Sequence, residues 1–219
     1  MNRDPLQLIV KIVMPAFLDT LYMVVIATTI STIIGFFIGI ILYVTDKDGL
    51  RPNASIYKVL DAVVNMIRSF PFIILVVSII PITRAIVGTS IGKNAAIVPL
   101  VFAGSPFIAR LIEGSLKDVD KGLVEVGKSF GLSHTQIIFK IAVKEAVPTI
   151  INNITFATVA ILGTTAMAGT VGAGGLGATA ITYGYQNFND TIMYGIVVIL
   201  IILVQLIQLV GCKIYRKKI

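Results

Sequence analysis

The sequence predicts an all-α polytopic membrane protein with five transmembrane helices. Hydrophobic residues make up 56% of the 219 residues and charged residues only 13%, whereas soluble domains carry about 25% charged residues. Two long runs, residues 20–45 and 191–212, contain no charge at all. A helix needs roughly 20 apolar residues to cross the hydrocarbon core. The composition therefore excludes a soluble globule, and it also excludes a disordered chain, which would be polar and poor in aliphatic residues.

The uncharged runs place the five spans in order. The first and the last lie in the two runs just named, and the second and third reach full length only by including Arg68 and Arg110. The fourth opens the uncharged run 146–189, whose glycine cluster at 169–177 predicts that the helix ends there and a flexible external turn follows. We expect spans near 18–44, 58–82, 94–112, 147–168 and 191–212.

The distribution of Lys and Arg predicts the orientation. Thirteen of the 18 basic residues fall in one set of segments and four in the opposite set, with Arg68 left over. Cytoplasmic loops are the ones enriched in Lys and Arg, so the C-terminus and the segment 113–145 are expected in the cytoplasm and the N-terminus outside. The net charge of +7 is then an orientation signal. We expect no nucleic-acid partner, because no basic stripe carries interleaved aromatic residues.

The cytoplasmic segment 113–145 is polar but patterned. Its hydrophobic residues recur at helical spacing (Leu123, Val126 and Phe130). Gly131 stands where a helix would stop with a left-handed residue, and Ser133 with Gln136 has the spacing of a capping box that starts a new helix. Two readings stay open from this pattern: a compact helical elbow that docks a partner, or a surface loop whose helix continues into the fourth span.

The same segment carries a motif. Glu125-Val126-Gly127, followed by Gly131 and Ile141, resembles the "EAA" loop of ABC importer permeases, with Glu125, Gly131 and Ile141 in register. Val126, Gly127, Val143 and Lys144 depart from that pattern. Further segments over nearly the whole chain are similar to the permeases of bacterial methionine importers: RSFPFIILVVSIIP (68–81), VGTSIG (87–92), GSPFIARLIEGSL (104–116), VGAGGLG (171–177) and YGYQNF (183–188).

The resemblance implies a type I ABC importer permease fold, with residues 1–219 as a single transmembrane domain in the bacterial inner membrane. It implies as partners a second copy of the chain, two cytoplasmic ATPase subunits, an extracytoplasmic substrate-binding lipoprotein and membrane lipid. ATP and Mg²⁺ would bind the ATPase, and this chain would bind no cofactor. The 120–141 loop would couple the ATPase to the permease through Glu125, Val126, Gly127, Phe130, Gly131 and Ile141.

Two glycine-rich stretches invite a nucleotide-site reading. Residues 172–177 fit G-x-G-x-x-G, which signals a dinucleotide site only within a βαβ unit. Residues 88–93 (GTSIGK) have three residues between the glycines, where a phosphate loop has four. We therefore expect no ATP site and no catalytic residue on this chain. The single His134 and single Cys212 offer no metal-ligand set.

Several residues within the spans are candidates for a role. Arg68 either extends its charge to the membrane surface or forms a structural pair with Asp61, and Pro71 should kink the second span. Gly35 and Gly39 form a G-x-x-x-G that suits close helix packing. The fourth span is rich in small and polar residues, so Asn152, Asn153 and Thr164 are candidates for lining a translocation path. By resemblance, Met167 is a candidate for its outer gate.

Two alternatives remain for the function. One is a permease of the same architecture for another amino acid or small solute. The other is an ion-coupled secondary carrier, which would need inverted repeats and intramembrane carboxylates. The sequence has no visible internal repeat, and its one interior acid candidate, Asp61, lies near the cytoplasmic face.

Overall fold

Almost all of the described chain is helical. The computed structural model describes residues 5–217, with side chains from residue 11 onward. The helices are α1 (Pro5–Thr45), α2 (Ala54–Ser69), α3 (Phe72–Ser78), α4 (Ile80–Val87), α5 (Lys93–Lys117), α6 (Lys121–Ser129), α7 (His134–Ile137), η1 (Ile138–Ala142), α8 (Val143–Gly169), α9 (Gly175–Thr179), η2 (Ala180–Gln186) and α10 (Asp190–Arg216). The segments η1 and η2 are π-helical.

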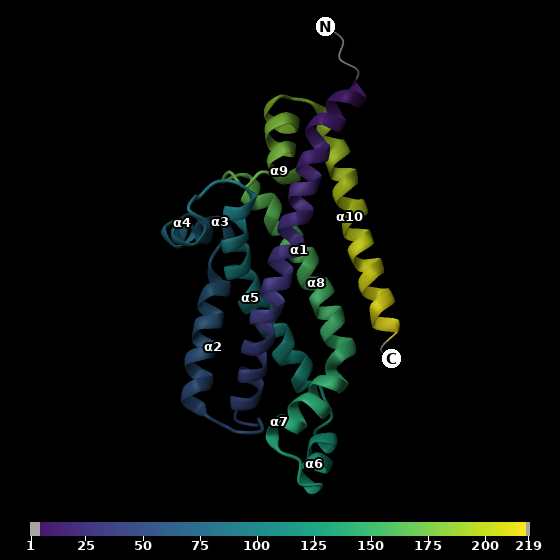
Figure 1. The fold of residues 1–219 in the computed structure, drawn as a ribbon. Helices are drawn as coiled ribbons and strands as arrows, with labels where there is room; N and C mark the ends of the chain where they lie inside the picture. Colours follow the sequence, from purple (N-terminus) through teal and green to yellow (C-terminus); the bar gives the residue numbers. More distant parts are fainter. Residues whose placement is uncertain (1–4, 218–219) are drawn as a thin grey trace.

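Four long helices, α1, α5, α8 and α10, give the molecule its elongated shape (Figure 1). Helix α5 packs against both α1 and α8, and its side chains Leu100, Ile108 and Ile112 are almost completely buried. Helices α6 and α7 stand at the end of the molecule opposite the N-terminus, whereas α9 stands beside the N-terminal part of α1 (Figure 1). The core therefore sits along α5, and the patterned segment projects from one end.

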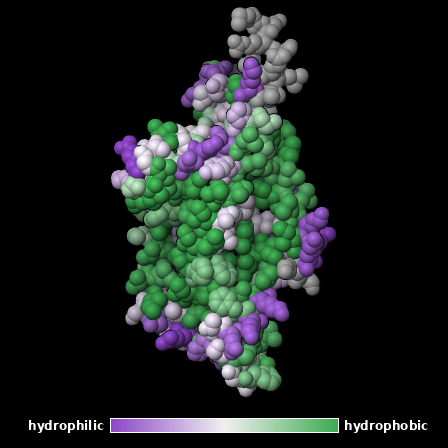
Figure 2. All heavy atoms as spheres, in the orientation of Figure 1, coloured by the Kyte–Doolittle hydropathy of each residue, from purple (hydrophilic) through white to green (hydrophobic). Residues whose placement is uncertain are grey.

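The surface agrees with a protein that spans a membrane. Hydrophobic residues cover the middle of the visible face, and hydrophilic residues gather toward its ends and at its right edge, beside the C-terminal end of α10 (Figure 2). Within the described residues, four helices are long and apolar enough to cross a bilayer: Lys11–Thr45, Lys93–Lys117, His134–Gly169 and Asp190–Arg216. The all-α polytopic fold is thus confirmed, with a fifth span only if α2 and α3 are counted together.

The second span differs from the expectation of one helix over 58–82. Helix α2 ends at Ser69, and α3 starts at Phe72 after a bend of 105°. The bend lies at Pro71, which has no N–H to donate and which disfavours the helical conformation in the residue before it. Phe70 indeed has extended backbone angles, φ −74° and ψ 130°. The kink predicted at Pro71 is confirmed, but it breaks the span.

The turn after the fourth span is shorter than predicted. Helix α8 ends at Gly169, but α9 already begins at Gly175 and η2 continues to Gln186. Leu176 anchors this segment, because it is fully buried against Val13 and Ile196 and its N–H donates to Thr20 Oγ1 at 2.8 Å. Buried tertiary contacts therefore convert a glycine-rich sequence into ordered helix.

Gly35 and Gly39 bring α1 into direct backbone contact with α5. A Cβ atom on Gly35 would lie 2.8 Å from the carbonyl oxygen of Ser105, and one on Gly39 would lie 2.7 Å from that of Ala109. Both distances are too short for real carbon–oxygen contacts, so these two positions require glycine. Close approach of this kind is how small-xxx-small stripes associate helices in membranes, where apolar burial alone gives no advantage over lipid.

The substitution Gly39→Val is expected to lower the melting temperature of the purified protein in detergent by about 3–10 °C, because overpacking of a closed core costs about 1–3 kcal/mol. Gly195→Ala in α10 is the matched control, since its Cβ would meet nothing within 4 Å. Equal melting temperatures for the two variants would contradict the close α1–α5 contact.

Candidate functional site

The patterned segment folds as an elbow, here defined as residues 121–141. Helix α6 ends at Ser129, and Gly131 turns the chain with φ +72°. The N–H of Gly131 donates to Lys128 O at 2.9 Å, and that of Leu132 donates to Gly127 O at 3.1 Å. Paired bonds of this kind close a helix end around a left-handed residue. The helix stop predicted at Gly131 is confirmed.

The second half of the elbow starts with the predicted cap. The Ser133 hydroxyl accepts from the N–H of Gln136, and the Gln136 side chain accepts in return from the N–H of Ser133 at 2.9 Å. From His134 the chain then runs as one helical rod through α7, η1 and α8 to Gly169. The structure combines the two predicted arrangements: α6 is a separate helix, and α7 is the start of the fourth span. Docking of a partner stays a prediction.

Helix α6 is buried at Gly127 and exposed over most of its length. Gly127 packs against the following helix so closely that a Cβ there would lie 2.5 Å from Ile141 Cδ1. Its large apolar side chains stay uncovered: Leu123, Val126 and Phe130 are 40%, 54% and 82% exposed. These three residues are called the elbow face below. Large apolar side chains in contact with water are typical of a surface that another protein covers.

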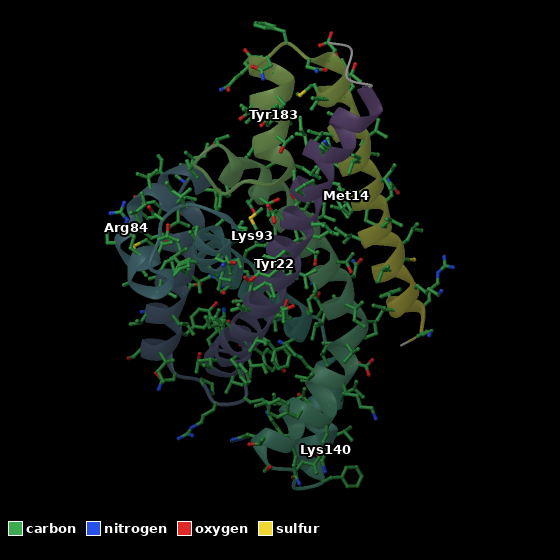
Figure 3. All side chains as sticks on the ribbon, turned by 45° about the horizontal axis from the view of Figure 1, so that its top comes forward. Met14, Tyr22, Arg84, Lys93, Lys140 and Tyr183 are labelled. Atoms are coloured by element: carbon green, nitrogen blue, oxygen red, sulfur yellow. The ribbon has the colours of Figure 1, made fainter. Side chains whose placement is uncertain are left out.

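Charged side chains surround the elbow face. Lys121, Glu125, Lys128 and Lys140 are all exposed, and Lys140 projects outward from the elbow (Figure 3). Glu125 and Lys128 also line a groove of about 370 Å³ between the elbow and the α1–α2 loop. An apolar centre with a charged rim is the usual anatomy of a protein–protein interface. Four of the six residues predicted to couple to the ATPase are exposed on this elbow: Glu125, Val126, Phe130 and Gly131.

The fourth span exposes one continuous stripe, here called the α8 stripe. From residue 149 onward its exposed members are Thr149, Asn152, Phe156, Gly163, Met167 and Thr170. At 100° per residue these positions fall within about 60° of one another around the helix. The stripe mixes hydroxyl, amide, thioether and aromatic groups, whereas a surface facing only lipid needs none of the polar ones. It suits the wall of a path for a small amphiphilic solute.

The remaining candidates of the fourth span lie beside the α8 stripe. The amide of Asn153 points to α5, where Nδ2 donates to Ser115 Oγ at 2.8 Å. The hydroxyl of Thr164 donates to Ile161 O of its own helix at 2.7 Å. Asn153 therefore holds α8 to α5. Of the four residues predicted to line or gate the path (Asn152, Asn153, Thr164 and Met167), Asn152 and Met167 are exposed on the stripe.

Arg68 does not form the pair with Asp61 that was one of two readings. It lies exposed at the end of α2, and the Asp61 carboxylate is bound by Arg110 of α5. Sequence reasoning also missed the role of Glu113, whose side chain is only 3% exposed. A signal was present, because Arg110, Glu113 and Lys117 follow one another at i, i+3 and i+7, the spacing at which side chains on a helix meet.

Met167, the predicted outer gate, is tested by Met167→Ala, which is expected to raise the leak of a small amphiphilic solute through the protein reconstituted in liposomes by about threefold or more, because a narrow apolar constriction closes a path by excluding water. Met167 is 49% exposed on the α8 stripe, and Met66 is 58% exposed on another helix, α2, so Met66→Ala is the control. Leak rates in liposomes decide the matter. If Met167→Ala leaves the leak unchanged, Met167 is not a gate.

Comparison with known proteins identifies relatives over most of the chain. Residues 35–215 match the family described as the inner membrane component of binding-protein-dependent transport systems. The probable D-methionine transport system permease protein MetI of Vibrio cholerae is 50% identical over 91% of this chain and 88% of its own length. The methionine import system permease protein MetP of Bacillus subtilis is 42% identical over 78% and 77%.

The fold also matches a solved structure. A chain of the MetNI methionine ABC transporter, solved in inward-facing conformations, superposes with a TM-score of 0.93 at 42% sequence identity, and all of both chains is covered.

Proposed function

Since the chain belongs to the family of inner membrane components of binding-protein-dependent transport systems, we propose that it is the permease subunit of an ATP-driven methionine importer. Two copies form the translocation path, and two cytoplasmic ATPase subunits drive it. A substrate-binding lipoprotein delivers the solute at the outer face. The N-terminus lies outside, and the elbow and the C-terminus lie in the cytoplasm. The chain itself hydrolyses nothing; ATP and Mg²⁺ bind the ATPase.

The elbow face is the observation that carries this proposal. Leu123, Val126 and Phe130 present exposed apolar surface at one end of the molecule, and burying it on a partner releases about 25 cal/mol for each Å². A groove on the ATPase that accepts the elbow face explains why these side chains are not buried in the permease.

The connection of the elbow to the path supplies the mechanism. Because α7, η1 and α8 form one rod from His134 to Gly169, a displacement of the elbow turns the helix that carries the α8 stripe. Closing of the ATPase pair on ATP then becomes a rigid-body rotation of the spans. Binding energy shifts the permease between inward-open and outward-open states only as far as ATP and the loaded binding protein favour one of them.

The substrate follows from the relatives and suits the path. The two curated relatives are a D-methionine and a methionine permease. Methionine is a zwitterion with an apolar thioether tail, and the α8 stripe offers both polar and apolar groups, with the charged Glu145 exposed about one turn before its first residue. A stripe of this composition can pass the solute without holding it.

The test is uptake of labelled methionine by an auxotroph that lacks its own importer and expresses this permease with its ATPase and binding protein. We expect excess unlabelled methionine to reduce uptake of the label by competition. We also expect uptake to persist when an ionophore collapses the ion gradients. Uptake of another amino acid in preference to methionine would overturn the substrate. Uptake that an ionophore abolishes while ATP is maintained would instead indicate an ion-coupled carrier.

A further inference from the structure

Helix α2 has few apolar contacts with the rest of the protein. Within this fully described helix, Val64 is the one buried residue. Leu60 and Ile67 are half-buried, and several of its large apolar side chains face outward; Ile56, Val59 and Met66 are between 48% and 67% exposed. Since a core helix normally buries a broad apolar face, something other than apolar packing must hold α2 in place.

A buried carboxylate on α5 supplies one set of contacts. Glu113 is 3% exposed, and three donors from two helices converge on it. Arg110 Nη1 donates to its Oε2 at 2.6 Å, Lys117 Nζ lies 2.8 Å from Oε1, and the hydroxyl of Tyr57 on α2 donates to Oε1 at 3.2 Å. A buried charge is stable only when it is paired and hydrogen-bonded in this way.

The two cations that bind Glu113 also reach beyond α5. Arg110 Nη2 bonds the Asp61 carboxylate and donates to Asn65 Oδ1 at 3.0 Å, both on α2. Lys117 Nζ donates to Asp46 Oδ2 at 2.6 Å, in the loop between α1 and α2. This hydrogen bond holds the pKa of Asp46 below its ordinary value, so the carboxylate stays ionised and paired at neutral pH. One connected network therefore fastens α2 and its leading loop to α5.

The network sits between the elbow and the broken span. Lys117 is the last residue of α5, and α6 of the elbow starts at Lys121. At its other end α2 leads into the 105° bend before α3. On the route through α5 and α2, the Glu113 network thus lies between the elbow and the bend.

We propose that Glu113 is a positioning residue for transport: through Arg110, Lys117 and Tyr57 it fastens α2 to α5, so that the inner half of the broken span moves with the elbow as one body. This inference rests on the proposed function, because the movement that it transmits is the one the ATPase drives. A network kept only for stability is the weaker explanation, since replacing a buried ion network with apolar side chains is often neutral or stabilising.

The first test measures coupling in liposomes that hold the complete transporter. Glu113→Gln is expected to raise the number of ATP molecules hydrolysed per methionine imported by about fivefold or more, because hydrolysis continues while α2 fails to follow. Tyr57→Phe removes only the hydroxyl bond and is expected to raise this ratio by about twofold. The control is Lys93→Gln, which breaks the exposed α1–α5 ion pair with Asp19 (2.7 Å) near the other end of α5 (Figure 3); its ratio should not change. A ratio that stays at the wild-type value in both test variants would overturn the proposal, even if uptake falls.

The second test does not depend on the substrate. In a Cys212→Ser background, spin labels at Val59 of α2 and Phe102 of α5, which are 67% and 39% exposed, report the distance between the two helices in nanodiscs. We expect one narrow distance in the unmodified network, unchanged by ATP and vanadate, and a broad distribution in Glu113→Gln and Tyr57→Phe. A narrow distribution in both variants would overturn the positioning role. Failure of the unmodified transporter to import methionine would overturn the proposed function, and the spin labels would still decide the role of Glu113.

Discussion

Replacing Val126 and Phe130 together with aspartate is expected to detach the ATPase and abolish methionine uptake, while the permease still folds and reaches the membrane. Both side chains are largely exposed in the isolated chain, at 54% and 82%, so the fold loses little. Burial of two such side chains on a partner contributes about 3–6 kcal/mol, which corresponds to a loss of affinity of about 10²–10⁴-fold. Two buried, unpaired carboxylates would weaken the contact further.

Co-purification of the ATPase with a tagged permease measures this loss, and size-exclusion chromatography checks that the variant is folded. Thr135→Asp is the matched control, because it adds a carboxylate to an exposed position of the elbow without removing apolar surface, and the first turn of a helix favours an acidic residue. Normal recovery of the ATPase with the double variant would show that the elbow face is not the docking surface.

Gly131→Val is expected to reduce uptake by about tenfold or more through the backbone alone. A Cβ on Gly131 would meet nothing within 4 Å, but the residue has φ +72°, where an L side chain costs about 1–2 kcal/mol and a β-branched one more. Gly131→Asn is the informative control, because asparagine tolerates the left-handed conformation. Uptake in liposomes should therefore fall in the order glycine, asparagine, valine, with asparagine close to the wild type.

Equal uptake by the asparagine and valine variants would contradict the sharp turn as the reason for glycine. If both lost uptake equally, the position would need the absence of any side chain, as a docked partner lying against Gly131 would require. If both kept it, the turn would not matter for coupling.

Local signals explain what the sequence could predict. The low charge content predicts five spans, because membrane insertion depends on composition over about 20 residues, and four of them are continuous helices in the structure. The stop at Gly131 and the cap at Ser133 were predictable because each is set by residues within one turn. The interruption at Pro71 was predictable for the same reason, but its angle of 105° depends on how α3 packs and has no sequence signature.

Contacts between distant residues explain what the sequence could not predict. Glycines at 172–177 indicate a loop, and only the burial of Leu176 against α1 and α10 shows that α9 is ordered. Asp61 has Arg68 within reach along its own helix, yet it binds Arg110, which is 49 residues away. Asn153 differs from Asn152 by one position, and that rotation of about 100° turns one amide toward α5 and leaves the other on the stripe.

The most direct test of the central claim, that a separate ATPase drives this permease through the elbow, is methionine uptake into liposomes with the purified permease alone and with its ATPase and binding protein. The account predicts uptake against a gradient only with all three proteins and ATP on the elbow side, and none when the elbow face carries Val126→Asp and Phe130→Asp. Concentrative uptake by the permease alone, or full activity of the double variant, would contradict it.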